Sequence, residues 1–264
     1  MMKSQGRFIL LYIIIGVNLL AGCGRKAAPQ YVIGVSQCSK DFWRDKFNKE
    51  LQMAEYLNDS IQVKLASSND DSKLQTRQIN QMIDEKVDLL VIAPNQLKTI
   101  SPAINRAYDK GIPVIIYDRK ANSNKYTAFI GCDNYAIGKS MGEFIAQKLQ
   151  GKGRVVEIRG LEGSSPALER HRGFMEAMKK FPGMQVVASE AGDWKEESGK
   201  KAMQRILDKT RDFDYVFSHN DRMGWGAYQV VRDRGLARNY KFTGMDAMAT
   251  RNGGLELVRD GIFE

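Results

Sequence analysis

Residues 88–95 read Asp-Leu-Leu-Val-Ile-Ala-Pro-Asn, and residues 114–119 read Val-Ile-Ile-Tyr-Asp-Arg. Each segment is a short apolar run that ends in polar residues. A strand that is apolar on both faces is buried on both faces, as in a parallel sheet that helices cover. The two segments therefore predict a parallel sheet, and ligands of such sheets bind beyond the carboxyl ends of the strands.

The rest of the chain from residue 31 onward repeats this pattern, with short β-rich runs alternating with longer amphipathic stretches. Strands are predicted at residues 31–36, 61–66, 87–93, 112–117, 127–131, 154–159, 184–189, 213–218 and 240–245. Helices are predicted at residues 43–57, 74–83, 100–108, 137–149, 174–181, 203–207 and 225–231, from apolar side chains at three- and four-residue steps. This alternation, with right-handed crossovers, predicts doubly wound parallel sheets.

The number of predicted strands bears on the domain organisation, because they are many for one open sheet in a chain of this length. Residues 129–134, Phe-Ile-Gly-Cys-Asp-Asn, leave one strand and enter a helix, which makes them a natural crossover. We therefore expect an α/β fold of two doubly wound parallel-sheet lobes. The N-terminal lobe is expected at residues 31–132 and the C-terminal lobe at residues 133–264.

The composition is that of a folded protein. The chain has 264 residues, of which 43% are hydrophobic and 27% charged, and this excludes disorder as the main state. Lys and Arg number 40 against 31 Asp and Glu, a formal charge of +9. The surplus is dispersed without a basic block, so we interpret it as solvated surface. A mild excess fits an anionic surface or nucleic acid but requires neither.

Residues 1–30 form a separate segment. Lys3 and Arg7 precede an apolar run at residues 8–20, which is short for a bilayer span of ~20 residues. A positive start, an apolar run and a small-residue exit are typical of a secretory signal. Residues 20–23, Leu-Ala-Gly-Cys, resemble the bacterial lipobox, which predicts lipidation of Cys23. An uncleaved anchor helix and a plain signal peptide remain as alternatives.

The leader is expected at residues 1–22 and a polar tether at residues 23–30. All three interpretations of the leader place the folded part in the periplasm, and the first two tether it to a membrane. Cys38 and Cys132 are then the remaining thiols. Free thiols are the simpler interpretation, and a disulfide is possible in an oxidising compartment.

Polar and aromatic side chains follow the predicted strands in both lobes. Aromatic rings offer faces for the C–H surface of a sugar, and Arg and Asp offer paired donors and acceptors for hydroxyls. Simpler interpretations exist, since Trp43 can merely pack its helix and Asp118 with Arg119 can be a solvated or capping pair. The candidate ligand-binding residues are Phe42, Trp43, Asp118, Arg119, Arg170, Trp194, Asn220 and Asp246.

These motifs resemble the type I periplasmic sugar-binding proteins, which are akin to ribose-binding proteins and to the effector domain of LacI-type repressors. The resemblance covers residues 31–264 and is carried by residues 33–36, 88–95, 111–114, 118–119, 130–131, 133–134, 138, 169–170, 173–174, 217–221 and 244–246. It implies that a sugar binds between the lobes and contacts the same eight residues. Trp43 and Trp194 stand where ribose binders usually have Phe, and Lys40 where they have Asn, so the identity of the sugar stays open.

A closer resemblance concerns residues 35–39, 42–45 and 126–131. They look like the periplasmic sensor of hybrid two-component histidine kinases, which implies sugar binding as the input of a system that regulates carbohydrate use. The partners implied are a small sugar, a membrane and a downstream kinase. The alternative is a lipoprotein that binds solute for an ABC sugar transporter, with a permease as its partner, and the lipobox favours this alternative.

The same resemblance makes the C-terminus unusual. In the family the chain crosses between the lobes three times and ends in the first lobe. Residues 257–264 are instead expected inside a second-lobe helix, so the return to the first lobe is expected to be missing, as in a fragment. Such a chain should expose apolar surface and be less stable than a full domain.

Two other function classes are disfavoured. A DNA-binding repressor needs a helix-turn-helix, for which residues 1–30 leave no room, so no nucleic-acid partner is expected. An enzyme is disfavoured because the sequence has no Gly-x-Ser-x-Gly, His-Glu-x-x-His or Cys-x-x-Cys motif. His171 and His219 are the only histidines and show no metal-ligand spacing, so we interpret them as satisfied polar or surface residues. We expect no catalytic residue, metal or cofactor.

Overall fold

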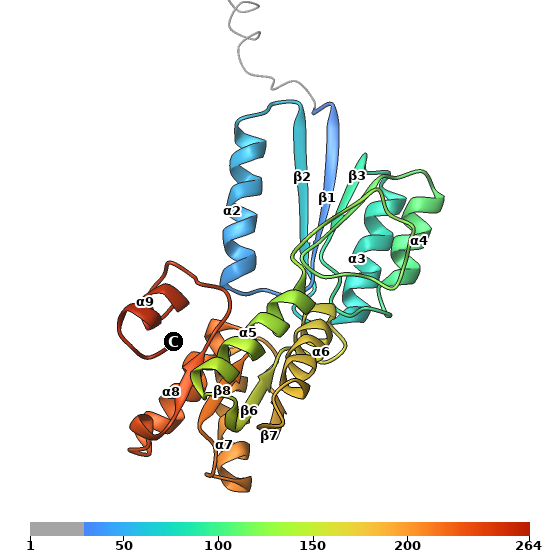
Figure 1. Ribbon diagram of the computed structural model, residues 1–264. Coiled ribbons are helices and arrows are strands. Elements are labelled where there is room, and N and C mark those ends of the chain that lie inside the picture. The colour runs from blue at the N-terminus through green and yellow to red at the C-terminus, as the bar shows by residue number, and fades with distance from the viewer. Residues whose placement is uncertain (1–28) are drawn as a thin grey trace, which may run out of the picture.

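Two parallel β-sheets organise the computed structural model, which describes residues 29–264 (Figure 1). The first sheet has the order β2-β1-β3-β4-β5 and the second the order β7-β6-β8-β9. The strands are β1 (Tyr31–Gln37), β2 (Ile61–Ser67), β3 (Leu89–Ile92), β4 (Val114–Tyr117), β5 (Ala128–Ile130), β6 (Lys152–Arg159), β7 (Gly183–Ala191), β8 (Tyr215–Ser218) and β9 (Lys241–Thr243). Every strand pair is parallel, so the predicted fold class is confirmed.

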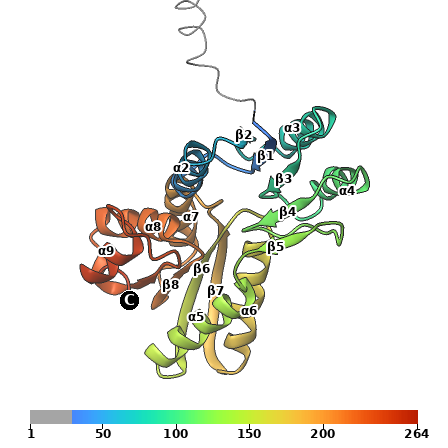
Figure 2. The ribbon, with the colours of Figure 1, turned by 90° about the horizontal axis from the view of Figure 1, so that it is seen from above.

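Helices cover both faces of each sheet (Figure 2). They are α2 (Phe42–Tyr56), α3 (Ser72–Asp84), α4 (Ser101–Asp109), α5 (Asn134–Lys148), α6 (Ser165–Lys179), α7 (Glu196–Lys209), α8 (Asp221–Asp233) and α9 (Gly254–Arg259), with a 3-10 turn at Ala237–Asn239. We call the first sheet with α2, α3 and α4 the first lobe. The second sheet with α5 to α9 is the second lobe.

Apolar burial explains this layering. In the first lobe, Ile79 of α3 and Ile104 of α4 pack with Leu90 and Ile116 of the sheet, and all four are essentially buried. The other face is thinner, because α2 buries only one residue completely, Arg44. In the second lobe, one core lies under α5 and α6 and a separate one under α7 and α8. The sheets are therefore sandwiched, as their continuous apolar strands predict.

Helix starts and the C-terminal helix are where the sequence-based expectations were wrong. Residues 257–264 are not all helical, because α9 ends at Arg259 and Phe263 packs into the second-lobe core. The expected starts at residues 137, 174, 203 and 225 lie three to nine residues late, since the helices begin at Asn134, Ser165, Glu196 and Asp221. Apolar periodicity marks only the buried turns. The real starts of α5 and α8 are set by caps, because the side chains of Asp133 and Asn220 accept backbone N–H bonds from the first turn.

Several expectations concern the N-terminal segment. Residues 1–22, Cys23 and most of the expected tether lie outside the described residues, so the structure does not bear on the leader or on lipidation. Within residues 29–264, none of the helices is both long and apolar enough for a membrane span. Cys38 and Cys132 are free thiols, the first buried and the second exposed.

Candidate functional site

The carboxyl ends of both sheets face one pocket between the lobes. The space inside it, part of which is open to solvent, measures about 620 Å³. It is lined by Asp41, Phe42, Trp43, Arg44, Asp118, Arg119, Pro166, Arg170, Trp194, Asn220, Arg222, Asp246 and Met248. The structure thus brings all eight sequence-predicted residues to the same pocket.

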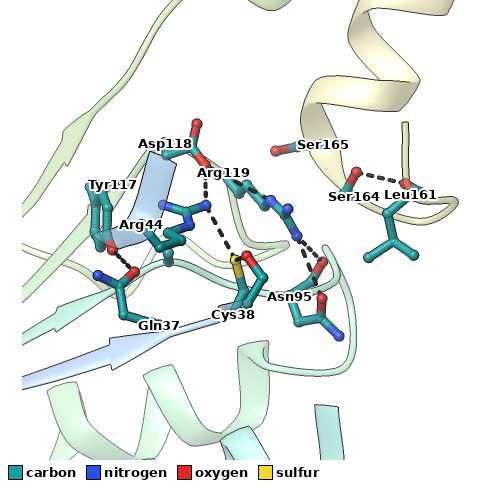
Figure 3. A network of polar contacts seen from close by, with 12 residues as sticks. Gln37, Cys38, Arg44, Asn95, Tyr117, Asp118, Arg119, Leu161, Ser164 and Ser165 are labelled. Carbon is teal, nitrogen blue, oxygen red and sulfur yellow. Dashed lines mark hydrogen bonds and ion pairs between the residues drawn. The ribbon is translucent and has the colours of Figure 1, made fainter. Parts of the chain in front are cut away.

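The first lobe supplies a pair of a buried guanidinium and a partly exposed carboxylate at its wall (Figure 3). Arg44 donates to the Asp118 carboxylate and, at 3.2 Å, to the Cys38 sulfur. Burial by itself lowers the pKa of Arg44, but the negative potential of Cys38 and Asp118 outweighs it and raises the pKa, so the guanidinium stays charged. Asp118 is therefore held in place with one face toward the pocket.

Arg119 is fixed by the loop that follows β3. Its Nη1 donates to the Asn95 carbonyl at 3.2 Å (Figure 3). Asn95 is itself held, because its Nδ2 donates to the Asp70 carbonyl at 2.8 Å and to Ser72 Oγ at 2.9 Å. The Arg119 side chain is 5% exposed. These contacts hold the planar Arg119 guanidinium in one position, where it can donate hydrogen bonds into the pocket.

The second lobe positions Arg170 and Trp194 together. Arg170 Nε donates to Asn134 Oδ1 at 2.9 Å, and its Nη1 donates to the His219 carbonyl. The guanidinium lies 5.4 Å from the centre of the Trp194 ring. Asn220 Nδ2 donates to the Trp194 carbonyl at 3.1 Å. Burial lowers the pKa of Arg170, while the charges of Asp246 and Asp118 act in the opposite direction.

Asp246 lies on a loop that one carboxylate organises. Asp221 Oδ1 accepts the N–H groups of Met245 at 2.9 Å and of Asp246 at 3.0 Å. Its Oδ2 accepts those of Met248 at 3.1 Å and of Gly254 at 2.8 Å. Burial, and next the charge of Asp221, raise the pKa of Asp246 to about 6, although Arg170 lowers it.

Several pocket residues were not predicted from the sequence. They are Asp41, Arg44, Pro166, Arg222 and Met248. A signal existed for Arg44 and Arg222, since each lies in the first turn of a helix that starts at the carboxyl edge of a sheet. Arg44 also stacks 4.7 Å from the Trp43 ring centre, and Arg222 lies 5.7 Å from that of Phe42. Nothing in the sequence pattern marks Met248.

The lobes also contact each other around the pocket. Lys195 of the second lobe lies 2.6 Å from Asp70 of the first, measured from Nζ to Oδ2. Lys120 Nζ lies 2.7 Å from Glu169 Oε1. A backbone bond of 2.9 Å runs from the Leu97 N–H to the Gly163 carbonyl. The structure is thus a closed arrangement of the two lobes.

The side chains that line the pocket are suited to binding a ligand through hydrogen bonds and apolar contacts. Guanidinium groups donate, carboxylates accept, and three aromatic rings supply apolar faces. Both histidines are engaged elsewhere, on the buried Glu157. Among residues 29–264, no cluster of His, Cys, Asp and Glu side chains has the makeup of a metal site. The arrangement suits a small polyhydroxy ligand.

Comparisons with known proteins agree with this geometry. The family described as periplasmic binding protein domain matches residues 32–264. The galactofuranose-binding protein YtfQ of Escherichia coli is 29% identical over 234 residues, which are 86% of this chain and 73% of that protein. The ribose import binding protein RbsB of Bacillus subtilis is 32% identical over 66% of this chain and 57% of its own length. The chain thus spans less than two thirds of several curated relatives.

Solved structures give the same result. The fructose binding periplasmic domain of a hybrid two-component system is 42% identical, with a TM-score of 0.85 over 88% of this chain and 78% of that one. The binding component of an arabinose ABC transporter from Shewanella sp. ANA-3, bound to arabinofuranose, is 26% identical. Its TM-score is 0.75 over 81% of this chain and 73% of its own.

Proposed function

Since the chain belongs to the periplasmic binding protein domain family, we propose that it binds a monosaccharide or small sugar between its two lobes. The family is one of binding modules rather than enzymes. The observation that carries the proposal is the pocket itself, in which Asp118, Arg119 and Arg170 are preset to pair with hydroxyls beside aromatic faces. Fixed donors and acceptors reject ligands that lack matching groups, which is the basis of sugar selectivity.

We further propose that this binding is the sensor input of a hybrid two-component system that regulates carbohydrate use. The support is the 42% identity to the periplasmic domain of such a system, against 29% and 32% for the two curated relatives above. Closure around the sugar would stabilise one arrangement of the lobes in proportion to its extra affinity for the sugar. A kinase beyond the membrane would then respond to that arrangement.

A second candidate is a lipoprotein that delivers sugar to an ABC transporter. It is favoured by residues 20–23, Leu-Ala-Gly-Cys, and by relatives named as import binding proteins. In either case we propose a leader at residues 1–22, a tether at 23–30 and lobes at 31–132 and 133–264. The tether would hold the binding module at a periplasmic membrane surface through Cys23 or an anchor helix.

The binding proposal is tested by a thermal-shift screen of the purified protein. The panel contains fructose, ribose, arabinose and a methyl galactofuranoside, because these represent the ligands of the relatives, with sucrose as a size control. A ligand that binds only the folded state raises the melting temperature in a concentration-dependent way. We expect one monosaccharide of the panel to do so at submillimolar concentration, and the absence of any shift counts against the proposal.

The choice between sensor and transporter is tested in the genome. Reading the coding DNA past the codon for Glu264 distinguishes the two. A frame that continues through a membrane span into a histidine kinase supports the sensor. A frame that stops after the binding domain, beside genes for an ABC permease, supports transport instead.

A further inference from the structure

A buried carboxylate lies beneath the pocket without facing it. Glu157 belongs to β6, between β7 and β8, and is fully buried. It accepts from His171 Nδ1 at 2.9 Å, from His219 Nε2 at 3.0 Å and from Ser189 Oγ at 2.6 Å. Burial by itself raises the pKa of Glu157, but the bonds from His171 and His219 outweigh it and lower the pKa to about 2. Glu157 is therefore an ionised, acceptor-only group.

This carboxylate fixes the tautomer of His219. Because an ionised carboxylate only accepts, the proton of the His219 ring lies on Nε2, and Nδ1 is left as an acceptor. The structure places the Gly160 N–H 3.3 Å from that Nδ1. Burial lowers the pKa of His219, which keeps the ring neutral and matches this arrangement. Each hydrogen bond in the series Glu157–His219–Gly160 thus has one direction: His219 Nε2 donates to Glu157, and the Gly160 N–H donates to His219 Nδ1.

The same chain of contacts supports two pocket residues. A Cβ added at Gly160 would lie 2.1 Å from the Trp194 ring, so the indole rests directly on the Gly160 backbone. The His219 carbonyl accepts from Arg170. Trp194 and Arg170 are the stacking ring and the planar donor of the second lobe. A shift of the His219 ring would therefore displace the Gly160 backbone and the Trp194 indole that rests on it, whereas Arg170 is held by the His219 main chain.

We propose that Glu157 and His219 are positioning residues of the pocket: Glu157 orients the His219 imidazole, which sets the place of the Trp194 indole. The proposal deepens the proposed sugar-binding function and rests on it for its effect on affinity. His171 bonds the same carboxylate but contacts neither Trp194 nor Gly160 in the hydrogen bonds and ring contacts of the structure. It therefore offers a control that shares the bond to Glu157 but is more exposed.

The first experiment needs no ligand. The chain has three Trp residues, so replacing Trp43 and Trp225 by Phe leaves Trp194 as the only indole. In that background, His219→Phe keeps an aromatic ring, although a larger one, and removes both ring hydrogen bonds. We expect its Trp194 emission to shift to the red and acrylamide quenching to rise by about twofold. His171→Phe should leave both quantities unchanged.

The second experiment measures sugar affinity in the otherwise natural chain. We expect His219→Phe to weaken binding by about tenfold or more and His171→Phe by less than about twofold. Both variants lose one bond to Glu157, but His219 is fully buried whereas the His171 side chain is 40% exposed. The affinities are therefore compared under conditions in which both variants are fully folded, so that a difference in stability alone does not produce the difference in affinity. Urea denaturation of both variants shows whether their stabilities are comparable.

If His219→Phe does not fold, His219→Gln replaces it. Its amide still donates to Glu157 but leaves the Gly160 N–H without an acceptor, so the Trp194 signal should move in the same direction. The proposal is overturned by unchanged Trp194 emission in the His219 variant, or by equal changes in both histidine variants. A protein that binds no sugar would defeat the proposed function alone, because the fluorescence comparison still decides the positioning role.

Discussion

Asp118 and Trp194 share an uncommon backbone conformation. Their φ angles are +61° and +68°, in the left-handed region that side chains with a Cβ rarely adopt. Such a conformation costs about 1–3 kcal/mol and persists only where the surroundings determine it. Both residues line the pocket, one from each lobe. Two of the nine non-glycine residues with a positive φ among residues 29–264 therefore line the pocket.

Replacing Asp118 by Ala should weaken sugar binding by roughly 2–4 kcal/mol, because ligand hydroxyls and Arg44 both lose an acceptor. Isothermal titration calorimetry with the sugar found in the screen measures this loss. Asp84→Ala is the control, since Asp84 pairs with Arg106 on the first lobe away from the pocket. Equal affinity of Asp118→Ala and the natural chain would show that Asp118 does not contact the ligand.

Asp246 makes a pH dependence of binding testable. Its pKa is raised from 3.8 to about 6, so the carboxylate is ionised above that pH and neutral below it. If ligand hydroxyls donate to the ionised form, affinity is full at pH 7.5 and falls about tenfold by pH 5. His171 has a raised pKa too, from its bond to Glu157. Asp246→Asn should flatten the profile and His171→Gln should not.

At this scale the sequence predicted part of the site. Strand ends were recognisable, so Asp118 and Asp246, which follow strands, were predicted as pocket residues. Arg44 and Met248 were missed for different reasons. Arg44 lies on the buried face of its helix, where the pattern predicts apolar side chains. Met248 reaches the pocket only because its loop is held by hydrogen bonds to Asp221.

At the scale of elements, the segment from β9 to α9 depends on Asp221. This buried residue at the start of α8 accepts four backbone N–H groups from Met245, Asp246, Met248 and Gly254. No apolar periodicity encodes the segment, so its course could not be predicted from the sequence. The segment's shape is instead set by hydrogen bonds to a single side chain.

We expect Asp221→Asn to lower the free energy of unfolding by about 2–4 kcal/mol. An amide NH₂ in place of one oxygen would face two N–H donors and leave them unpaired. Sugar binding should weaken as well, because Asp246 moves with the loop. Urea denaturation and calorimetry measure the two effects. Asp233→Asn, an exposed change at the end of α8, should alter neither, and an unaffected Asp221→Asn would contradict this account.

The other strands and helices could be predicted wherever both faces of the element are buried. The four residues of β8 are all buried, and the strand predicted at residues 213–218 contains them. Helix starts were not, since polar caps such as Asn220 and Asp133 lie outside the apolar pattern. The least predictable helix in its packing is α2, whose most buried residue is the charged Arg44.

For the whole molecule, the contacts between the lobes describe a closed state. The ion pairs Lys195–Asp70 and Lys120–Glu169 connect the lobes around the pocket. Pairing of the lobes across a pocket was implied by the family resemblance, not by any local pattern. The particular contacts depend on three-dimensional placement and could not be predicted from spacing.

Removing one of these ion pairs should favour opening slightly. Lys195→Ala is expected to weaken sugar binding by no more than about fivefold, because exposed ion pairs contribute up to about 1 kcal/mol. Without sugar, its radius of gyration in small-angle scattering should be larger than that of the natural chain. Lys64→Ala, which breaks an ion pair to Glu85 inside the first lobe, is the control. Identical scattering curves for all three proteins would contradict a role of the Lys195–Asp70 ion pair in holding the lobes together.

The most direct test of the account is a calorimetric titration of the protein with the sugar from the screen, repeated for Arg170→Ala. We predict one site per chain in the natural protein and a loss of affinity of roughly 2–4 kcal/mol in the variant, since Arg170 is held in the wall of the pocket. Undiminished affinity in Arg170→Ala, or no binding heat with any sugar of the panel, would contradict the claim that this pocket binds a sugar.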